Sequence, residues 1–191
     1  MAPRMNVEVD ADDRYWALVP RAFLDGAYGE AAGWVEGTLA RYLSVRPEAD
    51  AEERAAMRSI LERAVRELLP DAAFGLLFLP LAAPTAALVH VEIGAPGTGS
   101  EDLVASLLDG VPLGRAPEIE TVDVPAIGRG VSARFISGQA EPGAAAVAGI
   151  GYLISGERCA VRVTSAPMTT TMVGLIDQPL RHVIETLRVG V

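Results

Sequence analysis

Apolar positions in the last quarter of the chain follow two different periods, which predict strands and then a helix. Residues 144–154 are almost wholly apolar, 155–157 form a turn signal, and 159–165 alternate between apolar and polar positions. From residue 170 to 188, apolar residues recur at steps of three and four, which is typical of an amphipathic helix. These residues are Met172, Leu175, Ile176, Leu180, Val183, Ile184 and Leu187. Such a helix must cover an apolar surface, and the preceding strands are the nearest one.

The same criteria predict the elements before residue 144. They are two helices at 30–42 and 51–69, a strand pair at 74–81 and 86–93, a short helix at 101–108 and a strand pair at 119–124 and 131–137. Asp50 is a suitable N-cap for the second helix, and Glu52 and Glu53 suit its first turn. The predicted fold class is α+β, with a single curved antiparallel sheet of about six strands, helices packed on it and a long C-terminal amphipathic helix.

Length and composition predict one domain. The chain has 191 residues, and we expect a flexible acidic arm at 1–13 followed by a single α+β domain at 14–191. Half of the residues are hydrophobic but only 5% are aromatic, so the core consists mainly of Ala, Val, Leu and Ile. All sixteen basic residues are Arg, and with the abundant Ala and Gly this indicates a GC-rich bacterial genome. The absence of Lys excludes lysine-based chemistry.

Charge narrows the classes of partner. The net charge is −9 and no basic run occurs, which argues against nucleic acid and against an anionic membrane surface. The N-terminus has no apolar signal core, and the longest apolar runs are too short to span a bilayer. A single Cys excludes an internal disulfide and a cysteine-rich zinc site. We therefore expect a cytoplasmic protein.

The loop from Gly94 to Ser100 nearly matches a phosphate-binding motif. It reads Gly-Ala-Pro-Gly-Thr-Gly-Ser between a predicted strand and a predicted helix. Ser100 occupies the position of the lysine that neutralises phosphates, and Glu101 and Asp102 follow it. Because two carboxylates at a helix start repel an anion, the loop is interpreted as a connector whose helix begins with Ser100 as its cap.

No other set of residues predicts catalysis, a cofactor or a metal. His90 and Glu92 share one strand face and could form an acid–base pair, but alternation alone predicts a solvated face there. His182 lies opposite the apolar stripe of the last helix, and two histidines without matched spacing make no metal site. Cys159 begins the apolar face of its strand, where a structural thiol is expected. We expect no enzyme activity.

The two tryptophans are candidate interaction residues. Trp16 and Trp34 either anchor the N-terminal segment by packing, the favoured interpretation, or present aromatic anchors to a partner.

Both ends of the chain resemble Mog1/PsbP-like domains. The features are Tyr15-Trp16-Ala17-Leu18-Val19-Pro20 as an opening strand, and Val161-Arg162-Val163-Thr164-Ser165 followed by a helix finishing Val183-Ile184-Glu185-Thr186-Leu187-Arg188. The resemblance implies an α/β/α sandwich with a central antiparallel sheet. It also implies a non-enzymatic accessory or binding protein.

A second resemblance, to the helix-grip or START-like fold, implies a different function. In that fold a long C-terminal helix closes a cavity for a small apolar ligand. The hypotheses are therefore an accessory or adaptor protein that binds another protein or forms a homodimer, and a small-ligand binder. The first predicts no enclosed cavity and an exposed apolar patch. The second predicts a pocket between the last helix and the sheet, lined by Met172, Leu175, Ile176 and Leu180.

Overall fold

The computed structural model describes residues 6–22, 30–80, 85–96, 102–138 and 147–190. Contacts divide the chain into two compact units where the sequence predicts one domain. The discontinuous unit comprises Met1–Ala11 and Val91–Val191, and the inserted unit comprises Asp12–His90. The inserted unit is thus one continuous stretch of chain that interrupts the other unit.

The inserted unit contains a helical hairpin and a strand pair. β2 (Trp16–Pro20) pairs antiparallel with β3 (Phe74–Phe78), and α1 (Ala31–Val45) and α2 (Ala51–Glu67) lie between them in sequence. The Asp50 side chain accepts a hydrogen bond from the backbone N–H of Glu53, so the predicted cap of α2 is confirmed.

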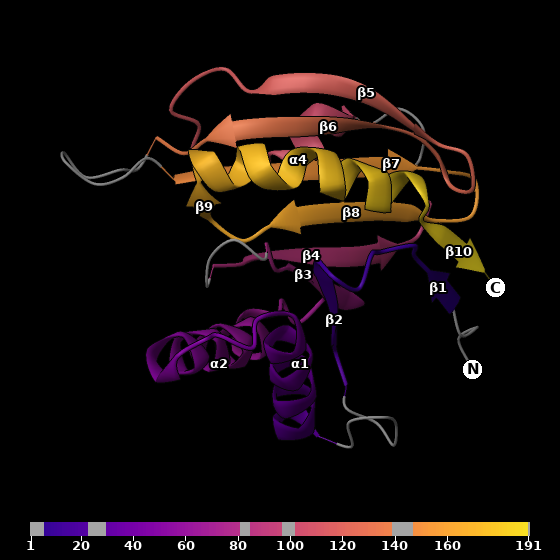
Figure 1. The fold of residues 1–191 in the computed structure, drawn as a ribbon. Helices are drawn as coiled ribbons and strands as arrows, with labels where there is room; N and C mark the ends of the chain where they lie inside the picture. Colours follow the sequence, from indigo (N-terminus) through magenta and orange to yellow (C-terminus); the bar gives the residue numbers. More distant parts are fainter. Residues whose placement is uncertain (1–5, 23–29, 81–84, 97–101, 139–146, 191) are drawn as a thin grey trace. The chain divides into compact units, whose positions relative to one another are not determined.

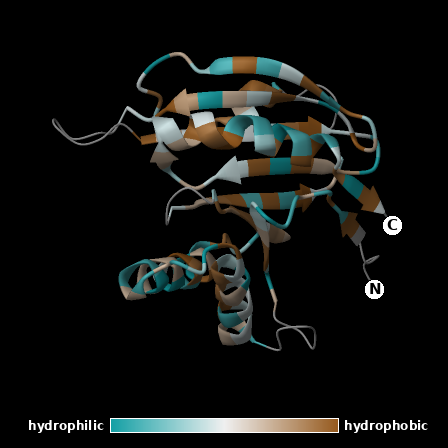
Figure 2. Ribbon diagram, viewed as in Figure 1, coloured by the Kyte–Doolittle hydropathy of each residue, from teal (hydrophilic) through white to brown (hydrophobic). Residues whose placement is uncertain are grey.

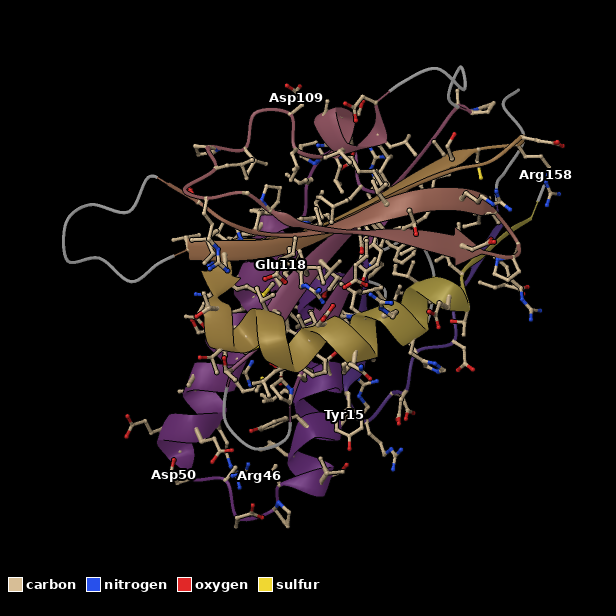
Figure 3. All side chains as sticks on the ribbon, turned by 90° about the horizontal axis from the view of Figure 1, so that it is seen from above. Tyr15, Arg46, Asp50, Asp109, Glu118 and Arg158 are labelled. Atoms are coloured by element: carbon tan, nitrogen blue, oxygen red, sulfur yellow. The ribbon has the colours of Figure 1, made fainter. Side chains whose placement is uncertain are left out.

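The discontinuous unit is built on an antiparallel sheet with a helix on each face. Its strands are β5 (Glu118–Val124), β6 (Gly128–Ile136), β7 (Val147–Ser155) and β8 (Ala160–Ser165), paired in that order, with β9 (Met168–Thr169) also paired to β7. The helices are α3 (Leu103–Leu107) and α4 (Thr170–Glu185). Figure 1 shows α4 lying along the sheet, and Figure 3 shows α3, next to the labelled Asp109, on the opposite face from α4.

Strand register determines which side chains share each face of this sheet. Glu118, Arg134 and Ile150 are cross-strand neighbours on the α4 face. Ile119 is level with Ala133 on β6, so it projects from the α3 face, because successive residues of a strand point to opposite sides. The side of the sheet that α4 covers is called the α4 face below, and the opposite side, where α3 lies, is called the α3 face.

The predicted fold class is confirmed, but the sheet is larger than the predicted six strands. β4 (Ala87–Gly94) has its first four residues in the inserted unit and its last four in the discontinuous unit. The hydrogen-bonded order is β2-β3-β4-β8-β7-β6-β5, and with β9 beside β7 the sheet has eight strands. Strands as short as β9 have too few residues to show alternation in a sequence.

The predicted acidic arm at 1–13 is not loose over its described part. β1 (Asn6–Glu8) pairs antiparallel with β10 (Arg188–Gly190), which forms a separate two-stranded sheet. The backbone N–H of Asp10 donates to Thr186 Oγ1 at 3.2 Å. Acidic composition predicts an arm, whereas pairing with a distant strand gives this segment its structure.

Candidate functional site

The residues predicted to line a pocket under α4 are divided between the interior and the surface. Ile176 and Leu180 are 0% exposed and Met172 is buried, so water reaches neither Ile176 nor Leu180. Leu175 is 51% exposed and points to solvent, which corrects its place in the pocket lining. At about 100° per residue, Leu175 lies roughly 120° from the centre of the buried stripe. The helix therefore lies flush on the sheet at Ile176 and Leu180.

The candidate interaction residues Trp16 and Trp34 are buried within the inserted unit. They are 4% and 1% exposed. Trp34 Nε1 donates to the carbonyl oxygen of Leu18 at 2.8 Å, and the ring of Trp16 lies 5.1 Å from that of Phe78. Their burial favours the packing interpretation and does not support exposed anchors.

His90 is buried, where alternation predicts a solvated residue. It is 4% exposed, and its Nδ1 accepts a hydrogen bond from the backbone N–H of Leu69, just beyond α2, at 3.4 Å. Burial lowers the pKa of His90, and the nearby Glu67 carboxylate only partly opposes this effect. The predicted solvated position is therefore wrong for His90, and the hydrogen-bond partner of its ring is the backbone of Leu69, not Glu92.

This burial predicts a stability that depends on pH. An unfolded histidine titrates near 6.5 and the folded one below that, so the unfolded chain binds more protons between these values. The contribution of neutral His90 is therefore complete above pH 6.5 and is lost as the pH falls toward the folded pKa. In urea titrations at several pH values, the free energy of unfolding should fall below pH 6.5. His90→Gln should make this fall less steep, by at most about 1.4 kcal/mol per pH unit. An unchanged decline in the variant would contradict a buried neutral imidazole.

The start of α3 and Cys159, the remaining candidates for chemistry, have structural roles. Gly97 to Ser100 lie outside the described residues, and Asp102 caps α3 in place of the predicted Ser100, accepting from the N–H groups of Val104 and Ala105. Burial raises the pKa of the Cys159 thiol, as suits a structural cysteine. Within the described ranges, His, Cys, Asp and Glu form no group of three that could hold a metal ion.

A charge cluster joins α4 to the edge of the sheet. Arg134 on β6 donates to Glu118 at 3.2 Å and to Glu120 at 2.6 Å on β5, and it also contacts Asp177 on α4. Arg181 on α4 pairs with Glu120 as well. Hydrogen bonds from Arg181 and Arg134 lower the pKa of Glu120, so this carboxylate is held in its charged form. Figure 3 shows the labelled Glu118 on the side of the sheet where α4 lies.

Tyr152 lies beneath this cluster on β7. Its side chain is fully buried, and its hydroxyl has no hydrogen-bond partner among the described residues. Burial raises the pKa of the phenol, so it is a neutral hydroxyl at physiological pH. The cluster holds two arginines and three carboxylates that already pair with one another, so it serves to fasten α4.

The α3 face carries an exposed apolar surface, which we call the β5-edge patch: Leu113, Ile119, Phe135 and Val147. Ile119, Val147 and Leu113 are 38%, 38% and 42% exposed, and Phe135 is half-buried. An added Cβ on Gly149 would lie 2.5 Å from the ring of Phe135, so that ring covers the glycine.

Register brings the four side chains of the β5-edge patch together. Ile119 is level with Ala133, Phe135 is two residues further along β6, and Leu113 bridges to Ser137 two residues beyond that. The backbone N–H of Ser137 donates to the carbonyl of Val147 at 2.7 Å. Since two residues of a strand span about 6.8 Å, the patch extends roughly 14 Å along the sheet.

Sequence reasoning does not single out the β5-edge patch. The alternation Glu118-Ile119-Glu120 indicates a strand with one apolar face, and Figure 2 shows hydrophobic and hydrophilic residues alternating along β5. Whether that face is covered depends on where α3 packs, and this is tertiary information. Leu107 of α3 contacts the position of Gly151, which leaves Ile119 exposed.

β5 also forms one edge of the sheet. In the described strand order it has a neighbour on one side only, β6. Its side chains on the α4 face include Glu118, 63% exposed, and Glu120, 40% exposed. The edge therefore presents carboxylates toward the α4 side and Ile119 toward the α3 side.

Comparisons with known proteins place the chain in no family. No family model matches it, and no curated protein does either. Among solved structures, the chain is similar to the crystal structure of LpqN involved in cell envelope biogenesis of Mycobacterium tuberculosis. The TM-score is 0.45 and the identity 9%, over 98% of this chain and 85% of that one. A likeness at this level supports no statement about function, and the resemblance to Mog1/PsbP-like domains stays a prediction. None of the helices in the described part of the chain has the length and apolar character needed to traverse a bilayer.

Proposed function

We propose that this protein is a non-catalytic accessory protein that binds another protein through the β5-edge patch and the adjoining edge of β5. The observation that carries the proposal is the exposed apolar surface of Ile119, Val147 and Leu113 beside the edge of β5, which has β6 as its one neighbour in the described strand order. Contiguous exposed apolar surface with a polar border is typical of protein-binding sites. The packing of Ile176 and Leu180 against the sheet supports a binding surface over an internal ligand pocket.

The partner segment is an extended strand that adds to β5. In strand addition, backbone hydrogen bonds supply affinity and alternating side chains supply specificity. On the α3 face its side chains meet Ile119 and the rest of the β5-edge patch, and on the α4 face they meet Glu118 and Glu120. Because Glu118 and Glu120 already pair with Arg134 and Arg181, the matching segment alternates apolar residues, which contact the β5-edge patch, with polar residues.

Site-specific photocrosslinking in the native host tests this proposal. A benzophenone amino acid at position 119 should give an adduct with a polypeptide, and mass spectrometry should locate it in a segment of alternating apolar and polar residues. Position 175 is the matched control, since Leu175 is more exposed than Ile119 but lies on α4. Equal adducts at both positions, or none at position 119, contradict the proposal.

Binding measured with the purified partner gives the second readout. Ile119→Lys should weaken the complex at least tenfold, about 1.4 kcal/mol, because it places a charge within the apolar contact and beside the β5 edge. Leu175→Lys should leave the affinity unchanged. Native mass spectrometry of protein purified from its host provides a further check, since a co-purifying small molecule in place of a polypeptide would favour the ligand-binding alternative.

A further inference from the structure

A groove of about 490 Å³ runs between α1 and α2 on the surface of the inserted unit. Its apolar lining comes from both helices: Leu39, Ala40 and Leu43 on α1, and Ala55 on α2. Ala40 and Ala55 are exposed although neither carries a polar group. Small side chains at these positions allow another helix to approach to the 8–10 Å between axes that is typical of packed helices.

Charged residues along the groove follow a pattern that is complementary to itself. Arg54, Arg58 and Glu62 lie at four-residue steps on α2 and all line the groove. Arg54 and Glu62 are therefore about 12 Å apart, with Arg58 midway. A rotation of 180° about an axis that passes through Arg58, perpendicular to α2, therefore brings Arg54 to the position of Glu62 and Glu62 to that of Arg54.

The residue on this axis does not repel its own copy strongly, because its charge is already paired. Arg58 forms a two-point contact with Glu36 of α1, one arm of which has Nη2 to Oε2 at 3.0 Å. Glu36 thus neutralises the centre of the groove, and Arg54 and Glu62 remain as opposite charges at its two ends. Both side chains are exposed.

From this symmetry we infer that a second copy of this chain occupies the groove. The two α2 helices cross antiparallel near Arg58, and the two α1–α2 hairpins form a four-helix bundle. Arg54 of each copy meets Glu62 of the other, while the small side chains of Ala40 and Ala55 leave room for the partner helix. This inference is independent of the β5-edge patch, because it uses only residues of the inserted unit.

Charge reversal tests the inference on the purified full-length chain. Sedimentation equilibrium should show a species of twice the 20.0 kDa chain mass. Arg54→Glu and Glu62→Arg should each raise the dissociation constant at least tenfold, because each places like charges opposite one another. The double variant R54E/E62R should return to within about threefold of the wild type, since the reversed charges again face each other. Circular dichroism confirms that each variant is folded.

A disulfide trap at the proposed axis gives an independent measurement. A residue beside a two-fold axis lies near its own copy, so Ser59→Cys should form a disulfide-linked dimer under mild oxidation. Ala51→Cys, on the same helix but two turns away, should not, and the natural Cys159 is buried. A wild-type monomer at every concentration overturns the inference. So does a dimer that neither charge reversal weakens, because it must then form through another surface.

Discussion

Replacing Leu180 with alanine lowers the free energy of unfolding by about 3 kcal/mol, whereas the same change at Leu175 alters it by less than about 0.5 kcal/mol. Both residues lie on α4, but Leu180 is 0% exposed and Leu175 is 51% exposed. Removal of the Leu180 side chain loses its transfer free energy and leaves a cavity in a close-packed interior. Leu175 loses only solvent contacts.

Urea denaturation followed by far-ultraviolet circular dichroism measures this pair of variants. Both tryptophans lie in the inserted unit, so their fluorescence serves as a control that reports a region without α4. A loss of less than about 1 kcal/mol at Leu180 would mean that α4 stands off the sheet. That result would revive the ligand-pocket alternative.

Replacing Gly130 with alanine is expected to cost about 3 kcal/mol, since the new methyl group has no space. An ideal Cβ at this position would lie 2.1 Å from the carbonyl oxygen of Leu153 and 2.7 Å from the Cα of Ile154. These are backbone atoms of β7, so relief requires the β6–β7 ladder to move. Loss of the ladder would also displace Arg134 from its partners on β5 and α4.

Gly174→Ala is the matched control for Gly130→Ala and has the opposite expected sign. Gly174 lies within α4, and an added Cβ would meet nothing within 4 Å. Alanine is favoured over glycine in a helix, so this change should stabilise the protein by about 0.5–1 kcal/mol. Thermal melts of the two variants give the comparison. A wild-type melting temperature for Gly130→Ala is incompatible with the strand register described above.

Local signals in the sequence predict the elements well. α2 begins after Asp50 as predicted, because capping and the spacing of Met57, Leu61 and Ala64 are properties of a short segment. β1 and β10 escape prediction for the opposite reason. Each has three residues, and each is stabilised by a partner more than 170 residues away.

The candidate site depends on information that a periodic pattern does not contain. Alternation around His90 predicts solvent exposure, but the backbone just beyond α2 covers this residue. The period of α4 includes Leu175, although its angle around the helix places it outside the buried stripe. For Ile119, the pattern gives the face but does not show whether another element covers it. Which residues are exposed on the β5-edge patch and in the α1–α2 groove is therefore decided by tertiary packing.

The pairing of β1 with β10 has a consequence for synthesis on the ribosome. All of Asp12–His90 has been made before the second segment of the discontinuous unit begins, so the inserted unit can fold while translation continues. Asn6–Glu8, although made among the first residues, has no β-partner until Arg188–Gly190 leaves the exit tunnel. The larger unit can therefore close only after translation has passed residue 190, so the first strand of the chain is among the last to pair.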